Sequence, residues 1–163
     1  DPLATHRSSR EEAGAWREAL RDRAAVIAFV EGPVRPNPRV RRWLLGPPGW
    51  TMPVCDIDLR VGGAYRYVWR HEENGTEMGM GGVYREIAAP ERLVATELFD
   101  DPWYPGEGRA TFVLAERHGR TVLTHTMRYE SKVARDGVLA SGIEEGVAAS
   151  FDRLAGLLEE PER

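Results

Sequence analysis

The sequence contains a single cysteine, Cys55, among 163 residues. One thiol cannot form an internal disulfide, so we expect a protein of a reducing compartment and predict a cytoplasmic location. Long apolar runs are missing too, since the longest is the segment Ala24–Val30. A membrane span needs about 20 such residues, and a signal peptide needs characteristic flanking segments. The sequence therefore predicts neither a membrane partner nor secretion.

Positive charge and metal-ligand patterns are scarce as well. The formal net charge is −4, whereas a nucleic-acid-binding protein needs a basic face. No group of His, Cys, Asp and Glu has the spacing of metal ligands. Residues 79–82 lack the features of a phosphate-binding loop, and Ser141 and Ser150 lack the Gly-x-Ser-x-Gly context of a nucleophile. We therefore predict no nucleic-acid partner, no metal and no cofactor.

What the sequence does contain is enough apolar surface for one globular unit. It is 42% hydrophobic and 29% charged, which is ordinary for a globular protein. A chain of this length buries about two thirds of its unfolded surface. We therefore predict a single domain spanning residues 1–163.

The first 38 residues give a mixed pattern. Asp1–Ser8 is polar, and we expect it to be frayed. Apolar residues at steps of three and four predict a helix over Arg10–Arg23. Ala24–Val30 either extends that helix or forms a strand, because β-branched and aromatic residues are dense there. Three prolines between Glu31 and Pro38 exclude a regular helix in that stretch.

Residues 42–67 organise the rest of the chain. Trp43 and Trp50 bracket the sequence Gly-Pro-Pro-Gly, which predicts a rigid turn, and a short helical turn is predicted at Arg39–Leu45. We expect the two tryptophans to anchor the joint between the N-terminal segment and a sheet. Alternation of apolar and polar residues then predicts six antiparallel strands connected as a meander: residues 55–60, 65–70, 78–87, 93–99, 110–116 and 123–129.

A long helix is predicted after the last strand. It opens near Ser131, carries an apolar stripe from Val138 to Leu158, and ends before Pro161. A meander and one amphipathic helix after it predict an α+β fold, because the helix can bury its stripe only against the apolar face of the sheet. The glycines at 79, 81 and 82 predict a bulge or a sharp bend in the third strand.

Several short segments together resemble a known family. They are Arg42-Trp43, Gly46-Pro47, Asp58-Leu59-Arg60 with Gly62-Gly63, residues 82–87 with Pro90-Glu91-Arg92-Leu93, and the long final helix. In order and spacing they resemble the AHSA1-like branch (activator of Hsp90 ATPase homologue 1-like) of the START/Bet v 1-like (SRPBCC) superfamily.

The resemblance implies a helix-grip fold, in which a curved antiparallel sheet wraps around the C-terminal helix and leaves an internal cavity. It covers a family-like core at residues 39–159. The N-terminal segment, residues 1–38, is atypical, because family members begin with a strand, an Ala-Pro turn and an amphipathic helix. Either Ala24–Val30 supplies the first strand here, or the segment is altered.

If the alternation holds, one set of side chains faces that cavity, and most of them are apolar, as in a small-molecule pocket. The alternative is that they simply form the core. Trp103 and Tyr104, between two prolines, are predicted to form a stiff aromatic lid over one mouth of the cavity, or else a loop pinned to the surface. The predicted ligand-binding residues are Tyr67, Trp69, Met80, Glu97, Phe99, Trp103, Phe112, His125, Met127 and Phe151.

Glu97 and His125 differ from the others because each interrupts an apolar face. A carboxylate or imidazole in such a place needs a partner or a shifted pKa. The two residues lie on strands separated by one strand, so they could meet across a ligand, orient it, or act as general acid and base. They could also be structural, with a buried hydrogen bond to a Tyr or Thr, or both could point outward if the strand register differs.

These patterns are compatible with three functions. The first is non-catalytic binding of a small hydrophobic or aromatic ligand between the sheet and the C-terminal helix. The second is an enzyme resembling polyketide cyclases or dehydratases, with Glu97 and His125 as its catalytic residues. The third, implied only by the family resemblance, is a co-chaperone that contacts an Hsp90-type ATPase, with a link to stress response. The pattern leaves open whether the protein forms a homodimer.

Overall fold

The computed structural model describes residues 4–8, 40–118 and 120–159. Within these ranges seven strands form one antiparallel sheet in the order β1-β7-β6-β5-β4-β3-β2. From β2 onward each strand pairs with the next one in the chain, and β1 pairs with β7. The strands are β1 (Ala4–Ser8), β2 (Trp50–Ile57), β3 (Ala64–His71), β4 (Glu77–Ala88), β5 (Arg92–Phe99), β6 (Gly108–Arg117) and β7 (Arg120–Tyr129).

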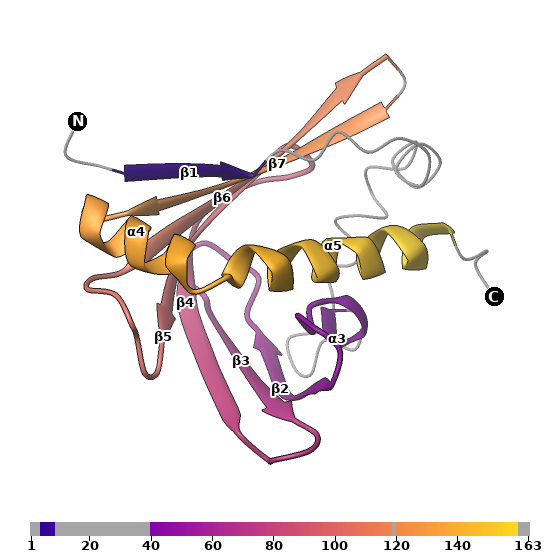
Figure 1. Ribbon diagram of the computed structural model, residues 1–163. Helices are drawn as coiled ribbons and strands as arrows, with labels where there is room; N and C mark the ends of the chain where they lie inside the picture. Colours follow the sequence, from indigo (N-terminus) through magenta and orange to yellow (C-terminus); the bar gives the residue numbers. More distant parts are fainter. Residues whose placement is uncertain (1–3, 9–39, 119, 160–163) are drawn as a thin grey trace.

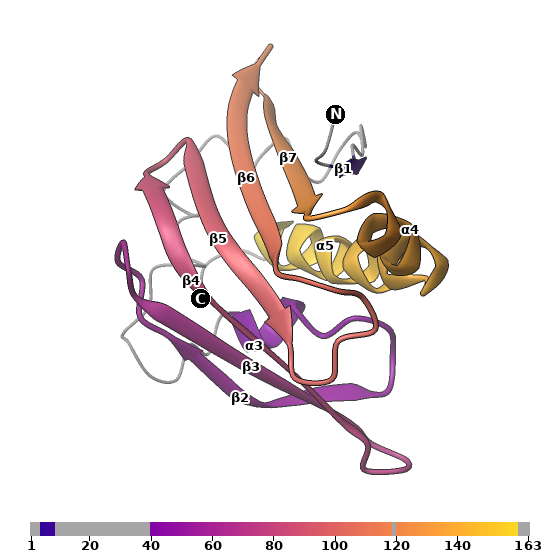
Figure 2. The ribbon, with the colours of Figure 1, turned by 90° about the vertical axis from the view of Figure 1, so that its left-hand side faces the viewer.

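The helices of the described ranges lie on one side of this sheet. The short α3 (Val40–Trp43) precedes β2, and α4 (Lys132–Ala140) and α5 (Ile143–Glu159) come after β7. Figures 1 and 2 show the sheet curving around α4 and α5, with β1 and β7 on one side of the helices and β2 to β4 on the other. The predicted meander of six strands is confirmed, and so is the α+β helix-grip fold.

Local sequence explains most of the turns. The residues of the predicted Gly-Pro-Pro-Gly turn form a turn in which Gly46 and Gly49 have positive φ. Positive φ at Gly62 and Gly75 closes the β2–β3 and β3–β4 connections, where an L side chain would be strained. At the second connection the side chain of Asn74 accepts a hydrogen bond from the Thr76 N–H.

The first strand corrects one prediction. Ala4–Ser8 was expected to be frayed, but it forms β1 and pairs with β7 along its whole length, with Ala4 opposite Tyr129 and Ser8 opposite His125. An edge strand gains its hydrogen bonds from a partner distant in sequence, so local composition does not reveal it. The predicted helix at Arg10–Arg23 and the alternatives for Ala24–Val30 lie outside the described residues.

The predicted C-terminal helix is interrupted. Ser141 caps the end of α4, where its side-chain Oγ donates a hydrogen bond to the carbonyl of Val138 at 2.6 Å. Gly142 comes next with a φ of 74°, and α5 starts at Ile143. A residue in the left-handed conformation cannot continue an α-helix, so the apolar stripe is carried by two helices rather than one.

The glycines of β4 were predicted to mark a bulge or a sharp bend, and the bulge lies elsewhere in this strand. The register shift of this strand lies between Tyr84 and Glu86, whereas Gly79, Gly81 and Gly82 pair regularly with β3. Their role is close approach. A methyl group at Gly79 would lie 2.0 Å from the Asp100 carboxylate, which is held there by a two-pronged ion pair with Arg66.

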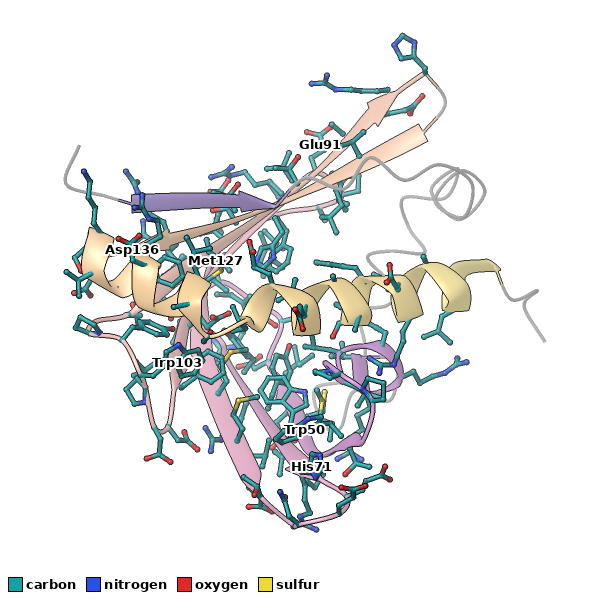
Figure 3. All side chains as sticks on the ribbon, viewed as in Figure 1. Trp50, His71, Glu91, Trp103, Met127 and Asp136 are labelled. Atoms are coloured by element: carbon teal, nitrogen blue, oxygen red, sulfur yellow. The ribbon has the colours of Figure 1, made fainter. Side chains whose placement is uncertain are left out.

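Trp43 was predicted to anchor the joint between the N-terminal segment and the sheet, and most of that segment lies outside the described residues. Within the described residues Trp43 anchors α3 to α5. Its ring stacks on Phe151 of α5, with centroids 5.9 Å apart. The Gly46 N–H donates to Ser150 Oγ at 2.9 Å, and the Gly46 carbonyl accepts from Arg153 Nη1 at 2.5 Å. We call these five residues, Trp43, Gly46, Ser150, Phe151 and Arg153, the α3–α5 clasp. Trp50 lies instead against His71 at the end of the β2–β3 pair, as Figure 3 shows.

The buried core occupies the concave side of the sheet. It runs from Met52 and Cys55 on β2 to Tyr129 on β7, and it includes Ala134 and Val138 of α4. The backbone of α5 comes closest to α3 and α4 among the described elements. No helix in the described part of the chain is long and apolar enough to cross a membrane.

Candidate functional site

Glu97 lies near the middle of the sheet, in the central strand of the seven, between two glycines. On β6 its partner is Gly108. On β4 the pair Gly81–Leu98 places Gly82 beside it. One strand further out on either side stands a tyrosine, since Tyr65 pairs with Gly82 and the Arg109–Arg128 pair sets Tyr129 opposite Gly108. A row of Tyr, Gly, Glu, Gly and Tyr therefore crosses five strands.

A tyrosine ring lies beside each of the two glycines. A methyl group at Gly82 would lie 2.8 Å from Cε1 of Tyr65 and 1.9 Å from the carbonyl oxygen of Thr96. That carbonyl accepts the Tyr65 hydroxyl at 2.6 Å. A methyl group at Gly108 would lie 3.6 Å from Cε1 of Tyr129. A side chain at Gly82 would therefore clash with the Tyr65 ring, whereas a methyl group at Gly108 would make ordinary van der Waals contact with Tyr129.

A third tyrosine reaches the row from the loop between β5 and β6. Tyr104 is only 4% exposed, and its ring packs edge-on against Tyr129, with centroids 5.4 Å apart. Its neighbour Trp103 is 41% exposed, and the ring centroids of Trp103 and Phe99 are 4.7 Å apart. The Tyr104 hydroxyl is buried and has no hydrogen-bond partner among the described residues. We call Glu97, Tyr65, Tyr104 and Tyr129 the Glu97 cluster.

The electrostatics show that these four groups lie close together. Loss of solvent raises the pKa of Glu97 from 4.5 to about 7. Burial, and after it the charge of Glu97, raise the pKa values of Tyr65, Tyr104 and Tyr129 well above the usual 10. Among the described residues the Glu97 carboxylate has no hydrogen bond or ion pair. Nothing in that part of the chain therefore compensates its charge.

Further acidic residues surround this cluster. The charge of Glu107 contributes to the raised pKa of Tyr65, and that of Glu144, in the first turn of α5, contributes to the raised pKa of Tyr129. Glu144 lies directly after the break between α4 and α5. Two further carboxyl groups, Glu107 and Glu144, therefore lie near the tyrosines of the cluster.

His125 belongs to a different group. Its ring stacks on Phe112, with centroids 4.3 Å apart and planes 5° from parallel. It also meets Phe151 of α5 edge-on at 6.1 Å. On β6, Phe112 is the partner of His125 and Gly108 the partner of Glu97. Four residues of strand span about 13 Å, so the structure does not bring Glu97 and His125 into direct contact.

The predicted ligand-binding residues divide by burial. The first group is buried in the core: Tyr67, Trp69, Met80, Phe99 and Met127. The second group is half-buried on the concave face or on the helix above it: Glu97, Phe112, His125 and Phe151. Trp103 is exposed at the edge, and Figure 3 shows it near the loop that precedes β6, with Met127 further inside.

Sequence reasoning missed three members of the cluster, the tyrosines. The alternation of β3 placed Tyr65 on the correct face, and that of β7 did the same for Tyr129, but neither was connected with Glu97. The connection depends on register, which sets which residues lie side by side across the sheet. Tyr104 lies in a loop, where no periodicity applies.

The described residues offer no obvious metal centre. They contain no group of three or more His, Cys, Asp or Glu side chains that could hold an ion. The single thiol, Cys55, is fully buried beside Tyr67 and Tyr84. The chemistry available at the Glu97 cluster is therefore that of one carboxyl group and three phenolic hydroxyls.

Solved structures show the same architecture. A crystal structure of a protein from Rhodobacter sphaeroides is 26% identical, with 99% of this chain and 95% of that chain covered and a TM-score of 0.70. One from Chromobacterium violaceum is 25% identical, with 98% and 99% covered and a TM-score of 0.66. The AHSA1-like protein from Aeromonas hydrophila, solved by NMR, is 17% identical, with 99% and 98% covered and a TM-score of 0.65.

Among curated proteins there is no significant match. The model of one protein family, however, matches residues 37–159, from just before α3 to the end of α5. Its range includes β2 to β7, both C-terminal helices and the whole Glu97 cluster. The chain belongs to the Activator of Hsp90 ATPase homolog 1-like family.

Proposed function

We propose that this protein binds a small hydrophobic or aromatic molecule, without catalysis, between its sheet and the C-terminal helix. One observation carries the proposal. Large apolar side chains remain half-buried where the sheet faces α5: Leu93 and Phe112 on the strands, and Phe151 on the helix. A packed core would enclose such rings completely, whereas a binding surface leaves them within reach of a ligand.

The aromatic residues under α5 support this proposal. Phe112, His125 and Phe151 form a continuous chain of ring contacts that bridges β6, β7 and α5. Such a chain presents flat faces and edges, against which an aromatic ligand gains dispersion and quadrupole contacts. The clasp fixes α5 through Ser150, Phe151 and Arg153, so the helix is held at a set position relative to these rings.

Fluorescence of N-phenyl-1-naphthylamine, a neutral probe that brightens in apolar surroundings, tests the proposal. We expect saturable binding to the wild type. Leu93→Trp places a larger side chain on the concave face and should weaken binding about tenfold or more. Leu98→Trp is the matched control, because Leu98 lies on the opposite face of β5 and is 44% exposed. No saturable binding, or equal loss in both variants, would contradict the proposal.

A second function is favoured by one feature, the pKa of Glu97. A carboxyl group with a pKa of about 7 can exchange protons near neutrality, as a general acid or base must. In a cyclase-like reaction Glu97 would act with the hydroxyls of Tyr104 and Tyr129 rather than with His125. Turnover of a candidate substrate that persists in Glu97→Gln would refute this role.

A third function is supported only by the family's description. Contact with an Hsp90-type ATPase would appear as stimulation of ATP hydrolysis when the two purified proteins are mixed. An unchanged hydrolysis rate over a range of concentrations would exclude it for that ATPase.

A further inference from the structure

We infer that the Glu97 cluster is the recognition site for an organic cation, an ammonium group carried on an apolar or aromatic body. This deepens the binding function proposed above and rests on it. The apolar part of the ligand would lie on the half-buried rings under α5. Its charged end would lie over the Tyr-Gly-Glu-Gly-Tyr row.

The first argument is that the Glu97 carboxylate, a hydrogen-bond acceptor, has no donor among the described residues. Glu97 projects from the central strand among apolar and aromatic groups, and the described residues supply it with no hydrogen bond and no ion pair. A carboxylate in such surroundings is costly unless a positive group accompanies it. Since Glu97 is only half-buried, a ligand can still reach it.

The second argument is the Tyr104 hydroxyl. The residue is only 4% exposed, and its hydroxyl has no hydrogen-bond partner among the described residues. Native proteins leave few buried polar atoms unsatisfied, and each one calls for an explanation such as a bound group or a functional role. Its oxygen can accept a hydrogen bond from an ammonium N–H, and Glu97 can accept another. Two acceptors that converge from different elements are what an ammonium group needs.

The third argument distinguishes a cation from a neutral or anionic ligand. Three tyrosine rings surround Glu97, and aromatic faces attract ammonium groups. Glu107 and Glu144 add two more carboxylates to the surroundings of Tyr65 and Tyr129. An anion would be repelled by this field, and a neutral group would leave the charge of Glu97 uncompensated.

Calorimetric titration with three naphthalene probes of similar shape tests the inference. They are 2-(1-naphthyl)ethylammonium, the neutral 2-(1-naphthyl)ethanol and the anionic 1-naphthylacetate. At pH 8 we expect the ammonium compound to bind about tenfold tighter than the alcohol, and the carboxylate to bind weakest. Glu97→Gln should remove the advantage of the ammonium compound while leaving the alcohol unchanged. Glu77→Gln, an exposed glutamate of β4 that pairs with Arg70, is the charge-matched control.

The dependence on pH gives an independent readout. The groups around Glu97 are Tyr65 of β3, Tyr104 and Glu107 of the β5–β6 loop, Tyr129 of β7 and Glu144 of α5. The tyrosines stay protonated because their pKa values are raised. With a Glu97 pKa of about 7, affinity for the ammonium probe should rise about tenfold from pH 6 to pH 8. Glu97→Gln should abolish most of that rise.

The outcomes separate this inference from the function on which it rests. If the naphthylethanol binds but the ammonium compound binds no tighter, the cation site is refuted while the hydrophobic binding site stands. If Glu97→Gln keeps the full preference for the ammonium compound, the cluster is not the recognition site. If none of the three probes binds, and N-phenyl-1-naphthylamine does not bind either, both proposals fail.

Discussion

The α3–α5 clasp and the Glu97 cluster differ in whether their polar groups have hydrogen-bond partners. In the clasp both backbone groups of Gly46 are used, one by Ser150 and one by Arg153. In the cluster the carboxylate of Glu97 has no partner in the described part of the chain, and the hydroxyl of Tyr104 has none. One polar group of the clasp, the indole N–H of Trp43, also has no hydrogen-bond partner among the described residues. The Trp43 ring is nevertheless stacked on Phe151.

This difference distinguishes a region that stabilises the fold from a region that is available for binding. Satisfied hydrogen bonds stabilise a structure modestly, whereas unsatisfied buried groups cost more than a bond returns. A protein that keeps such groups at one place gives up stability there, commonly for the sake of function. Mutations in the clasp should therefore destabilise the protein. Mutations that remove the unpaired polar groups of the cluster should stabilise it.

The largest expected effect is in the clasp. Trp43→Ala removes a ring that is 9% exposed and stacked on α5, so the free energy of unfolding should fall by about 3–5 kcal/mol. Urea denaturation monitored by circular dichroism would measure it. Trp103→Ala is the control, because that side chain is 41% exposed, and it should cost less than half as much. Equal losses would mean that the clasp is not a special anchor.

Glu97→Gln should act in the opposite direction and depend on pH. The pKa of Glu97 is about 7 in the folded protein and 4.5 without burial, so the folded state binds more protons between these values. The free energy of unfolding contributed by this group therefore falls as pH rises from about 4.5 to 7.

Glutamine carries no charge at any of these pH values. Above pH 7 the variant should be more stable than the wild type by at most about 3 kcal/mol, and near pH 4 the two should match. Thermal unfolding of both proteins across this range would show whether their stabilities separate as the pH rises. A gain that does not change with pH would contradict the buried charge.

Two hydroxyl deletions give the smallest effects and the sharpest contrast. Tyr104→Phe removes an unpaired buried hydroxyl and should stabilise the protein by about 1 kcal/mol. Ser150→Ala removes the acceptor of the Gly46 N–H and should destabilise it by about 1 kcal/mol, after the better helix propensity of alanine offsets part of the loss. Denaturant midpoints would measure both. Changes of the same sign would erase the contrast between the two regions.

Much of the fold could be predicted from local pattern. The alternation at Tyr65, Tyr67 and Trp69 predicted a strand with one buried face, and all three side chains are buried. The turn at Asn74-Gly75 and the stripe of the C-terminal helices were predicted for the same reason. Periodicity and turn chemistry act within a few residues, so a sequence displays them directly.

The candidate site was less visible. Glu97 was singled out because it interrupts an apolar face, and the structure shows it surrounded by aromatic rings. Its association with His125 was reasoned from strand order alone, and the register places the two residues on different rows of the sheet. The break at Gly142 was also missed, since an isolated glycine in a helical pattern can be tolerated or can end the helix.

The sequence by itself determined strands β2 to β7, the amphipathic character of the C-terminal segment and the presence of a carboxylate on an apolar face. These depend on neighbours in the chain. Only the tertiary structure decided that β1 pairs with β7, that Gly82 and Gly108 flank Glu97, and that Tyr104 returns from a loop to join them. Those contacts connect residues far apart in sequence, and their geometry is set by register and packing across the whole sheet.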